Sequence, residues 1–523
     1  MGDEAGATVK VLLAASEVVG FAKTGGLADV AGSLPPALAR LGVQIAVVMP
    51  LYRSVRVGPI PIQPTPHLLA VPVGRRVIPS PLWQSHLPDS DVPIYFIEQP
   101  DFFERDDPAH GRGLYQYTVA GGIKHDYYDN GERFTFFCRA VLEVVRALDL
   151  RPDILHANDW QTGLVPVYLA EPYRRRYGYE QLRSVFTIHN IAYQGYFPGE
   201  MLPLTGLEPR LFNYKQLECY GQLNFLKAGV VFADRITTVS PSYAEEIQTP
   251  EYGYGLQGVL QERRHLLRGI VNGVDYRAWN PATDPYIPFN YTPETVREGK
   301  LACKRALQAR CGLRVDEQVP LLGMVARLVD QKGVDLVAAG AEDLLRRGVQ
   351  LVILGDGDPH YHNWLRDIAG RYPNQFSLNL TFDERLAHQI EAGIDLFLMP
   401  SRYEPSGLNQ LYSLKYGAVP VVRATGGLAD TIVDCTEGTI AAGTATGFWF
   451  HAYTPQALLA AVDRALELYR NAPATWVWLQ QNGMRQDWSW DRSARQYLEV
   501  YRDLLAQRDA GCPIQPAQPR NRY

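Results

Sequence analysis

A glycine-rich motif near residue 25 recurs near residue 426. The first copy reads Lys-Thr-Gly-Gly-Leu-Ala-Asp from Lys23 to Asp29, and the second reads Thr-Gly-Gly-Leu-Ala-Asp from Thr425 to Asp430. Each copy follows an apolar, strand-like run and leads into a sequence that favours a helix. A glycine pair lets backbone amides approach a ligand closely, and a helix N-terminus there favours anions. The repeat predicts two similar α/β halves, each with an edge that binds phosphate or sugar.

Two cations follow an apolar strand in the second half of the chain. Arg327 comes at the end of this strand, and Lys332 stands just before the next expected helix. Two fixed cations beside a helix N-terminus suit a diphosphate leaving group, whose negative charge grows as the bond to a sugar breaks. The alternative interpretation is a solvated strand end with two surface cations.

A carboxylate follows another strand of the same half. The strand ends at Pro400, the loop carries Glu404, and a helix begins near Gly407. A carboxylate in this place can accept hydrogen bonds from sugar hydroxyls or stabilise an oxocarbenium-like centre. The amides of Gly407 and Leu408 would receive phosphate or sugar oxygens. The alternative is that Glu404 only caps the helix.

Two strand ends in the first half carry polar and aromatic residues. One ends in His189 and Asn190, and the other carries His156, Asp159 and Trp160. Together they indicate the wall of a carbohydrate site, where an imidazole near the anomeric carbon would stabilise developing positive charge. His156 precedes the exposed end of its strand, so we expect it to be a core histidine.

A metal site is the alternative at Asp356-Gly357-Asp358, which has the Asp-x-Asp form that binds divalent ions in some sugar transferases. The same residues suit a tight turn after the strand 350–354. Because Arg327 and Lys332 already neutralise a diphosphate, we expect no metal and no other cofactor. The 30 tyrosines and 9 tryptophans favour contacts to sugar rings, although many must be core residues.

The composition limits the class of protein. A chain of 523 residues is too long for one core, so two domains are expected. The net charge of −5 gives no excess of positive charge that would attract nucleic acid or an anionic membrane, and we expect neither as a partner. The 6 cysteines form no CxxC pair, which indicates reduced thiols. No apolar run approaches the length of a membrane span and the first residues do not resemble a signal peptide, so a cytoplasmic protein is expected.

Strands and helices alternate along both halves, which predicts two doubly wound parallel sheets. We place the first domain at residues 1–267 and the second at 268–490, with strand carboxyl ends facing a shared deep cleft. The last helix, residues 491–506, is expected to return to the first domain. The Pro- and Gln-rich tail 509–523 is expected to be disordered. Expected strands are 9–15, 44–49, 94–97, 154–157, 184–188 and 235–239 in the first half, and 320–326, 350–354, 376–380, 396–399 and 419–423 in the second.

Six segments, taken together, resemble the bacterial glycogen synthase and plant starch synthase family over nearly the whole chain. They are Lys23 to Leu27, Phe186 to Asn190, Asn272 to Asp275, Ala326-Arg327 with Lys332, Glu404 to Gln410, and Gly426 to Leu428.

The resemblance implies a GT-B fold and a retaining hexosyltransferase. The implied reaction moves glucose from ADP-glucose to the non-reducing end of an α-1,4-glucan such as glycogen or starch, without a metal. Its location would be the cytoplasm, a plastid-type stroma or the surface of a glucan granule. The implied catalytic residues are Glu404, His189, Arg327 and Lys332. The implied donor residues are Lys23, Gly26, Arg327, Lys332, Gly407, Leu408, Gly427 and Asn272, and the implied acceptor or sugar pocket holds Asp29, Asp159, Trp160 and Asn190.

The chain departs from the family pattern at three positions. Tyr412 stands where related transferases often have a second glutamate, Ser406 replaces a common cysteine, and Gln161 replaces a common histidine. With no carboxylate nucleophile evident, a front-face transfer in a cleft closed by hinge motion fits better than a covalent double displacement. The alternatives left open are a GT-B transferase with a small acceptor and a non-catalytic glucan-binding protein. The choice between ADP- and UDP-glucose, the acceptor length, granule binding and the oligomeric state also stay open.

Overall fold

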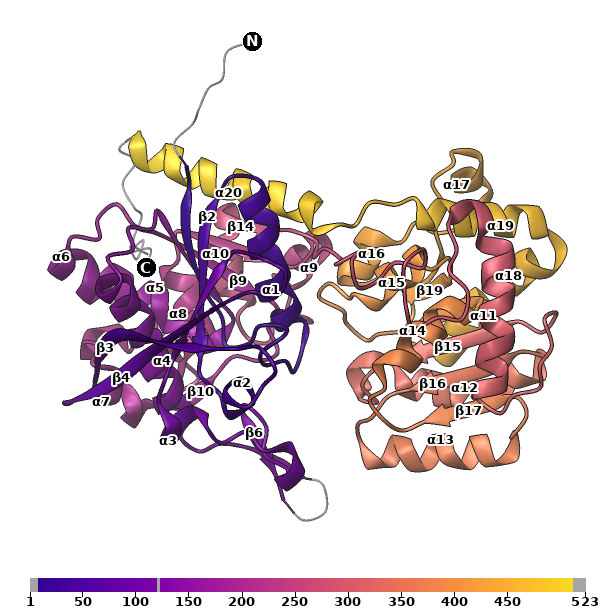
Figure 1. Cartoon of the computed structure of the whole chain (residues 1–523), viewed down its shortest axis with the longest axis horizontal. Helices are drawn as coiled ribbons and strands as arrows, with labels where there is room; N and C mark the ends of the chain where they lie inside the picture. Colours follow the sequence, from indigo (N-terminus) through magenta and orange to yellow (C-terminus); the bar gives the residue numbers. More distant parts are fainter. Residues whose placement is uncertain (1–7, 120–122, 511–523) are drawn as a thin grey trace, which may run out of the picture. The chain divides into compact units, whose positions relative to one another are not determined.

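The computed structural model describes residues 8–119 and 123–510 (Figure 1). Within these residues, the chain folds into two compact units. Unit 1 contains residues 8–239, 244–273 and 490–510, and unit 2 contains residues 240–243 and 274–489. The predicted boundary near residue 267 lies shortly before Gly273, where the chain leaves unit 1 for the main segment of unit 2. The tail predicted to be disordered lies outside the described residues, except that Asp509 ends the last helix and Ala510 follows it.

Unit 1 is built on a sheet of nine strands in the order β14-β13-β9-β8-β1-β2-β5-β4-β3. The strands from β14 to β5 are parallel, and the hairpin β3–β4 adds to β5 in antiparallel fashion. The order of the chain reverses between β1 and β8. The strands are β1 Lys10–Ala14, β2 Gln44–Pro50, β3 Gln63–Val73, β4 Arg76–His86, β5 Pro93–Ile97, β8 Ile154–Asn158, β9 Arg183–Ile188, β13 Arg235–Thr238 and β14 Leu267–Gly269.

Helices cover this sheet, and two small sheets lie beside it. The central strands β8 and β9 are buried along their whole length, as expected where helices cover both faces of a parallel sheet. One small sheet has the order β10-β12-β11, with β10 Tyr196–Pro198, β11 Glu218–Cys219 and β12 Gln222–Asn224, and the other pairs β6 Gln116–Thr118 with β7 Lys124–Asp126. The helices of this part are α1 Gly26–Arg40, α2 Arg53–Arg56, α3 Pro100–Phe103, α4 Asn130–Ala147, α5 Leu164–Tyr168, α6 Arg174–Tyr177, α7 Leu202–Thr205, α8 Phe225–Phe232 and α10 Gln257–Glu262. The helix α9 Pro241–Glu246 begins in unit 2 and ends in unit 1.

The last helix, α20 Trp490–Asp509, belongs to unit 1 and packs against α1 (Figure 1). Its Tyr501 hydroxyl lies 2.7 Å from Nδ1 of His156 on β8, and Nε2 of the same ring lies 2.6 Å from the Thr187 hydroxyl. His156 is fully buried, and burial lowers its pKa to about 3. The imidazole is therefore a neutral core group that joins α20 to the sheet, as its position in the strand predicts.

Unit 2 is built on a parallel sheet of six strands in the order β17-β16-β15-β18-β19-β20. This is the Rossmann order, and it reverses between β15 and β18. The strands are β15 Leu321–Val325, β16 Gln350–Leu354, β17 Phe376–Asn379, β18 Leu396–Met399, β19 Val419–Arg423 and β20 Phe448–Phe450. The helices are α11 Val296–Arg310, α12 Val334–Arg346, α13 Pro359–Arg371, α14 Glu384–Gly393, α15 Asn409–Lys415, α16 Gly426–Thr431, α17 Glu437–Ala441, α18 Pro455–Asn471 and α19 Pro473–Met484.

The core of unit 2 lies between its sheet and the helices α12, α13, α18 and α19. Leu322, Val337, Leu351 and Val462 are fully buried in it, and Trp476 of α19 closes one side. Among the residues that the structure describes, no helix is long and apolar enough to cross a membrane.

Candidate active site

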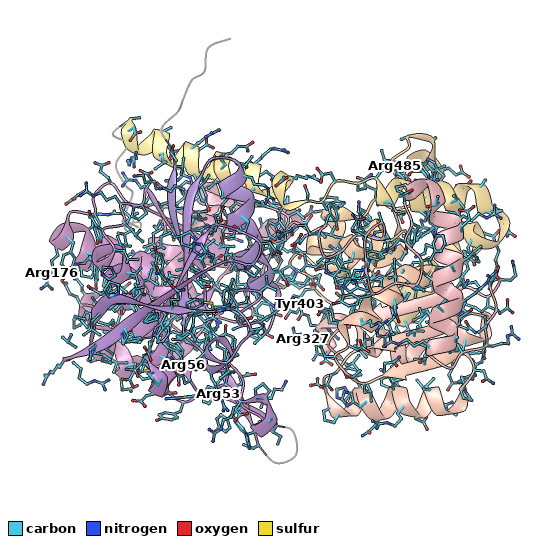
Figure 2. The ribbon with its side chains drawn as sticks, in the orientation of Figure 1. Arg53, Arg56, Arg176, Arg327, Tyr403 and Arg485 are labelled. Atoms are coloured by element: carbon cyan, nitrogen blue, oxygen red, sulfur yellow. The ribbon has the colours of Figure 1, made fainter. Side chains whose placement is uncertain are left out.

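The predicted site residues of unit 2 follow the strands at which the sheet order reverses. Arg327 follows β15, and Glu404 follows β18, at the carboxyl edge where the loops after the two strands diverge. In open α/β sheets this switch point is the usual place for a ligand. Figure 2 shows the side chains of Arg327 and Tyr403 on the same side of unit 2. The topology therefore brings Arg327, Lys332 and the loop of Glu404 to one edge.

Lys332 and Glu404 form an ion pair at this edge. The Lys332 Nζ lies 2.6 Å from Oε2 of Glu404, and the hydroxyl of Ser401 donates to the same oxygen over 3.0 Å. The side chains are 19% and 6% exposed, so the pair is largely shielded from water. Removing one partner of such a pair leaves a poorly solvated charge. The contact fixes both groups that are predicted to act on the donor.

Arg327 differs from Lys332 in its surroundings. Its side chain is exposed, and among the described residues we find no hydrogen bond or ion pair to it. A guanidinium with free donors can take an anion in a bidentate contact. Lys332 is thus a cation held by a carboxylate, whereas the Arg327 guanidinium is exposed with its donors open to an anion, which suits a diphosphate that must be bound and released.

The glycines of unit 2 allow two loops to pack closely. Gly407 has a φ of +73°, a left-handed conformation that favours glycine. A Cβ on Gly427 would lie 2.2 Å from the carbonyl oxygen of Ser406, and the Gly427 amide donates to the Glu404 carbonyl over 3.0 Å. The close approach predicted at Gly427 is therefore made to the protein's own backbone. Leu408 precedes α15, whose first residue Asn409 donates to the carbonyl of Val325 at the end of β15 over 2.6 Å.

In unit 1, the glycine-rich loop after β1 is held by Glu17, a residue that the sequence patterns did not single out. Glu17 is 3% exposed and accepts hydrogen bonds from the Thr24 amide and, over 3.2 Å, from the Gly25 amide. The Thr24 hydroxyl and the Tyr115 hydroxyl also donate to it, over 2.6 and 2.7 Å. A buried acid directly after an apolar strand is the signal that could have identified it.

The other charges of this loop are paired with each other. Lys23 Nζ lies 2.7 Å from Asp29 in the first turn of α1, with side chains 48% and 20% exposed. Gly26 begins α1, and a Cβ there would meet nothing within 4 Å. Lys23 is therefore held near the start of α1, where an anion is favoured, and Gly26 leaves the approach to the helix open.

His189 and Asp159 meet at the carboxyl ends of β8 and β9. The His189 amide donates to Oδ1 of Asp159 over 2.7 Å, and its Nε2 lies 3.0 Å from Oδ1 of Asn158. Because the Asn158 amide nitrogen donates to Ala14, its oxygen is the acceptor for His189. Burial lowers the pKa of His189 to about 3, so the ring is neutral at physiological pH.

Asp159 is held in an unusual backbone conformation with φ +58° and ψ −179°. Such conformations cost energy and are concentrated at functional sites. Burial raises its pKa to about 7, although the amides of His189 and Asn190 lower it. A carboxyl group that exchanges its proton near neutrality is thus positioned against the backbone of His189.

Trp160 and Asn190 have structural contacts of their own. Trp160 is 8% exposed and lies among the rings of Tyr115, Phe134 and Phe197, with centroid distances of 4.9 to 6.3 Å. Its faces are packed, so it supports the wall of the site instead of offering an open stacking surface. The Asn190 oxygen accepts from the Ala192 amide over 3.0 Å and fixes the turn after β9. Asn272 lies after β14, and its Oδ1 has no hydrogen-bond partner among the described residues.

The segment Asp356-Gly357-Asp358 forms a turn between β16 and α13. The Leu328 amide donates a hydrogen bond to the Asp356 carbonyl, and the Asp358 amide donates to the Leu328 carbonyl. The Asp356 carboxylate lies 3.1 Å from Nε2 of His362. Across residues 8–119 and 123–510, no three His, Cys, Asp or Glu side chains are grouped so that they could hold a metal ion.

Tyr412, at the position of the second glutamate in some transferases, lies in an aromatic stack. Its ring is parallel to that of Trp279, with a centroid distance of 3.9 Å, and His388 stacks on the other face of Trp279 at 3.8 Å. The stack joins α15 and α14 to the loop of Trp279. This position therefore contributes packing where a carboxylate would contribute charge.

Comparisons with known proteins show the family of the chain. Residues 10–262 match the family described as starch synthase catalytic domain, and residues 309–476 match glycosyl transferases group 1. The glycogen synthase of Syntrophotalea carbinolica is 50% identical, covering 95% of this chain and 99% of its own. Glycogen synthase 1 of Methylococcus capsulatus is 47% identical, covering 98% and 99%.

Two solved structures are also similar. The catalytic domain of starch synthase IV from Arabidopsis thaliana, bound to ADP and acarbose, has a TM-score of 0.86 and 31% identity, covering 95% of this chain and 99% of that one. A sucrose-phosphate synthase from Thermosynechococcus elongatus has a TM-score of 0.55 at 17% identity, with the same coverage of 95% and 99%, and shows the fold alone.

Two Rossmann-type units, together with the match to glycosyl transferases group 1 and the similarity to a starch synthase structure, define a glycosyltransferase of the GT-B class. The chain belongs to the glycogen synthase and starch synthase family. The family and the fold predicted from the sequence are confirmed. The roles of the individual site residues stay predictions.

Proposed function

We propose that this protein transfers glucose from ADP-glucose to the non-reducing end of an α-1,4-glucan, with retention of the anomeric configuration. The observation that carries the proposal is the shielded Lys332–Glu404 pair beside the exposed Arg327, at the switch point of unit 2. Family membership supports the donor and the acceptor, since the relatives include glycogen synthases and a starch synthase bound to ADP and acarbose.

In the proposed reaction, Lys332 and Arg327 bind the diphosphate of the donor. As the bond between the anomeric carbon and the diphosphate oxygen breaks, the two cations stabilise the charge that develops on the leaving group. The acceptor hydroxyl attacks the same face of the sugar and gives its proton to the departing phosphate oxygen. The new glycosidic bond therefore keeps the configuration of the old one.

Glu404 and His189 would act on the sugar. The Glu404 carboxylate balances Lys332 and can accept hydrogen bonds from glucose hydroxyls. The neutral imidazole of His189 does not repel the positive charge that develops at the anomeric carbon. Lys23, at the start of α1, would contact the phosphates from unit 1. The two cations provide the charge that a metal would otherwise supply, so we propose a reaction independent of metal and cofactor.

The product of the reaction tests this proposal. The protein is incubated with ADP-glucose labelled in the glucose, glycogen and EDTA, and the glucan is then digested with β-amylase. We expect label in the glycogen, released by the digestion as maltose, because the new linkage is α-1,4 at the non-reducing end. Label that resists β-amylase would contradict retention or the linkage, and a need for added metal would contradict the metal-free reaction.

Two further assignments belong to the same proposal. The partners are the nucleotide sugar and the glucan, with neither nucleic acid nor a membrane, and the location is the cytoplasm. Transfer to a small acceptor, the alternative GT-B activity, would show as a labelled disaccharide or disaccharide phosphate when glucose or fructose 6-phosphate is supplied in the absence of glucan.

A further inference from the structure

Two tyrosines outside the site described above have strained backbones. Five described residues other than glycine have a positive φ, and three of these are aspartates, which tolerate this conformation. The other two are Tyr220, with φ +52°, and Tyr254, with φ +48°. A bulky residue in this region costs energy and must be held there by the surrounding structure.

Each of the two tyrosines is followed by a glycine that also has a left-handed backbone conformation. Gly221 has φ +80° and Gly255 has φ +87°, so each Tyr-Gly pair forms a turn with two left-handed residues. The first turn joins β11 Glu218–Cys219 to β12 Gln222–Asn224. The two turns also touch, since a Cβ on Gly255 would lie 3.0 Å from Cε2 of Tyr220.

The rings at these turns are exposed. Tyr220 is 79% exposed and Tyr254 is 44% exposed, while Tyr193 and Tyr196 nearby are 54% and 37% exposed. Tyr196 lies on β10, which pairs with β12, and the Gln194 side chain donates to the Tyr254 carbonyl over 3.0 Å. We refer to Tyr193, Tyr196, Tyr220 and Tyr254 as the tyrosine platform. It combines flat apolar rings with neutral hydroxyl groups.

The platform is continuous with the carboxyl edge of the unit 1 sheet. Tyr193 and Tyr196 follow His189 and Asn190, and the Tyr193 amide donates to the Asn190 carbonyl over 3.2 Å. Residue Asn224 of β12 caps the N-terminus of α8, which runs back to the start of β13. In a parallel sheet such a helix begins at the carboxyl edge, so the platform lies at the edge of unit 1 where His189 lies.

We propose that the tyrosine platform binds the acceptor glucan beyond the glucose units at the point of transfer. The apolar faces of α-1,4-linked glucose rings would stack on Tyr220 and Tyr254, while the phenol hydroxyls contact sugar hydroxyls. The neutral character of these four side chains favours a neutral polysaccharide over an anionic ligand. This inference rests on the proposed function, because it extends the acceptor site of the same reaction.

Initial rates with glycogen, maltoheptaose and maltose as acceptors test the platform. Tyr220→Asn and Tyr254→Asn remove a ring while keeping a residue that accepts a left-handed backbone. We expect each to raise KM for glycogen and maltoheptaose by about 3- to 10-fold, with kcat, the donor KM and the KM for maltose little changed. Tyr220→Phe keeps the ring and should stay near wild type. Tyr128→Ala, a change at a 93% exposed tyrosine elsewhere in unit 1, is the control.

The outcomes separate the two claims. A wild-type protein that transfers glucose to no glucan would overturn the proposed function. Active variants with unchanged KM for long acceptors would overturn the platform alone. An altered sedimentation coefficient without a change in KM would assign the tyrosines to an interface between copies of the chain, and would also overturn it. Melting temperatures of both Asn variants near wild type exclude unfolding as the cause of a raised KM.

Discussion

Lys332 carries the fixed positive charge that the leaving diphosphate would meet in unit 2, and Glu404 holds its ammonium group at 2.6 Å. We expect Lys332→Ala to lower kcat about 100- to 1,000-fold, which is about 2.7–4 kcal/mol of transition-state stabilisation. The measurements are kcat with ADP-glucose and glycogen and the melting temperature. Lys124→Ala, at an exposed lysine on β7, is the matched control. Near-normal turnover in Lys332→Ala would remove this residue from the site.

Asp159 gives unit 1 a specific dependence on pH. Burial raises the pKa of its carboxyl group from 3.8 to about 7 in the folded protein. Between these values the unfolded chain releases the proton and the folded protein keeps it, so this group lowers the free energy of unfolding as pH rises toward about 7. The stabilisation from the protonated Asp159 carboxyl group is fully present below the pKa of this group in the unfolded chain. It is lost once the pH exceeds the pKa of the group in the folded protein.

Urea unfolding of wild type and Asp159→Asn between pH 5 and pH 8 measures this effect. We expect the stability of wild type to fall relative to that of the variant across this range. Asp149→Asn is the control, because Asp149 also has a positive φ, of +44°, but lies at the surface. Parallel curves for wild type and Asp159→Asn would contradict the raised pKa.

Single residues were predictable where their chemistry follows directly from a strand end. Arg327, Lys332, Glu404 and His189 all follow strands, and the topology brings the first three to one edge of unit 2. Glu17 was missed because its role depends on the fold of a loop several residues later. The packing around Trp160 was missed because an isolated tryptophan in a sequence does not show which rings surround it.

At the scale of elements, α20 is held to unit 1 by a buried polar contact between Tyr501 and His156. Tyr501→Phe would leave Nδ1 of a fully buried imidazole without this partner. We expect it to lower the free energy of unfolding by about 1–3 kcal/mol, measured by urea unfolding. The control is Tyr497→Phe on the same helix, since the Tyr497 hydroxyl is buried without a hydrogen-bond partner among the described residues. Equal effects of the two changes would contradict the role of Tyr501.

Most parallel strands of both units were predicted to within a few residues, because each is a short apolar run between turns. The three-residue parallel strands at the sheet edges, β14 and β20, were missed. The hairpin β3–β4 was missed, since Pro64, Pro72, Pro79 and Pro81 interrupt its pattern. The three-stranded sheet β10–β12 was also missed, because strands of two or three residues leave no periodicity to detect. Two residues of the tyrosine platform belong to this three-stranded sheet, since Tyr196 lies on β10 and Tyr220 lies in the turn between β11 and β12.

At the scale of the whole molecule, the predicted groups of the transfer reaction come from both units. Unit 1 contributes Lys23, Asp159 and His189, and unit 2 contributes Arg327, Lys332 and Glu404. A front-face transfer forms no bond between sugar and protein. We therefore expect rapid-quench mass spectrometry of the protein with ADP-glucose to show no glucosyl adduct, with or without glucan. A trapped adduct on a carboxylate would replace this path with a double displacement.

The release of nucleotide tests the central claim most directly. Purified protein is incubated with glycogen and EDTA, and with either ADP-glucose or UDP-glucose, while ADP and UDP are quantified. The account predicts release of ADP that depends on glycogen and lengthens its chains, with much slower release of UDP. Equal or faster use of UDP-glucose would contradict the proposed donor, and no release from either donor by folded protein would contradict the proposed transfer to a glucan.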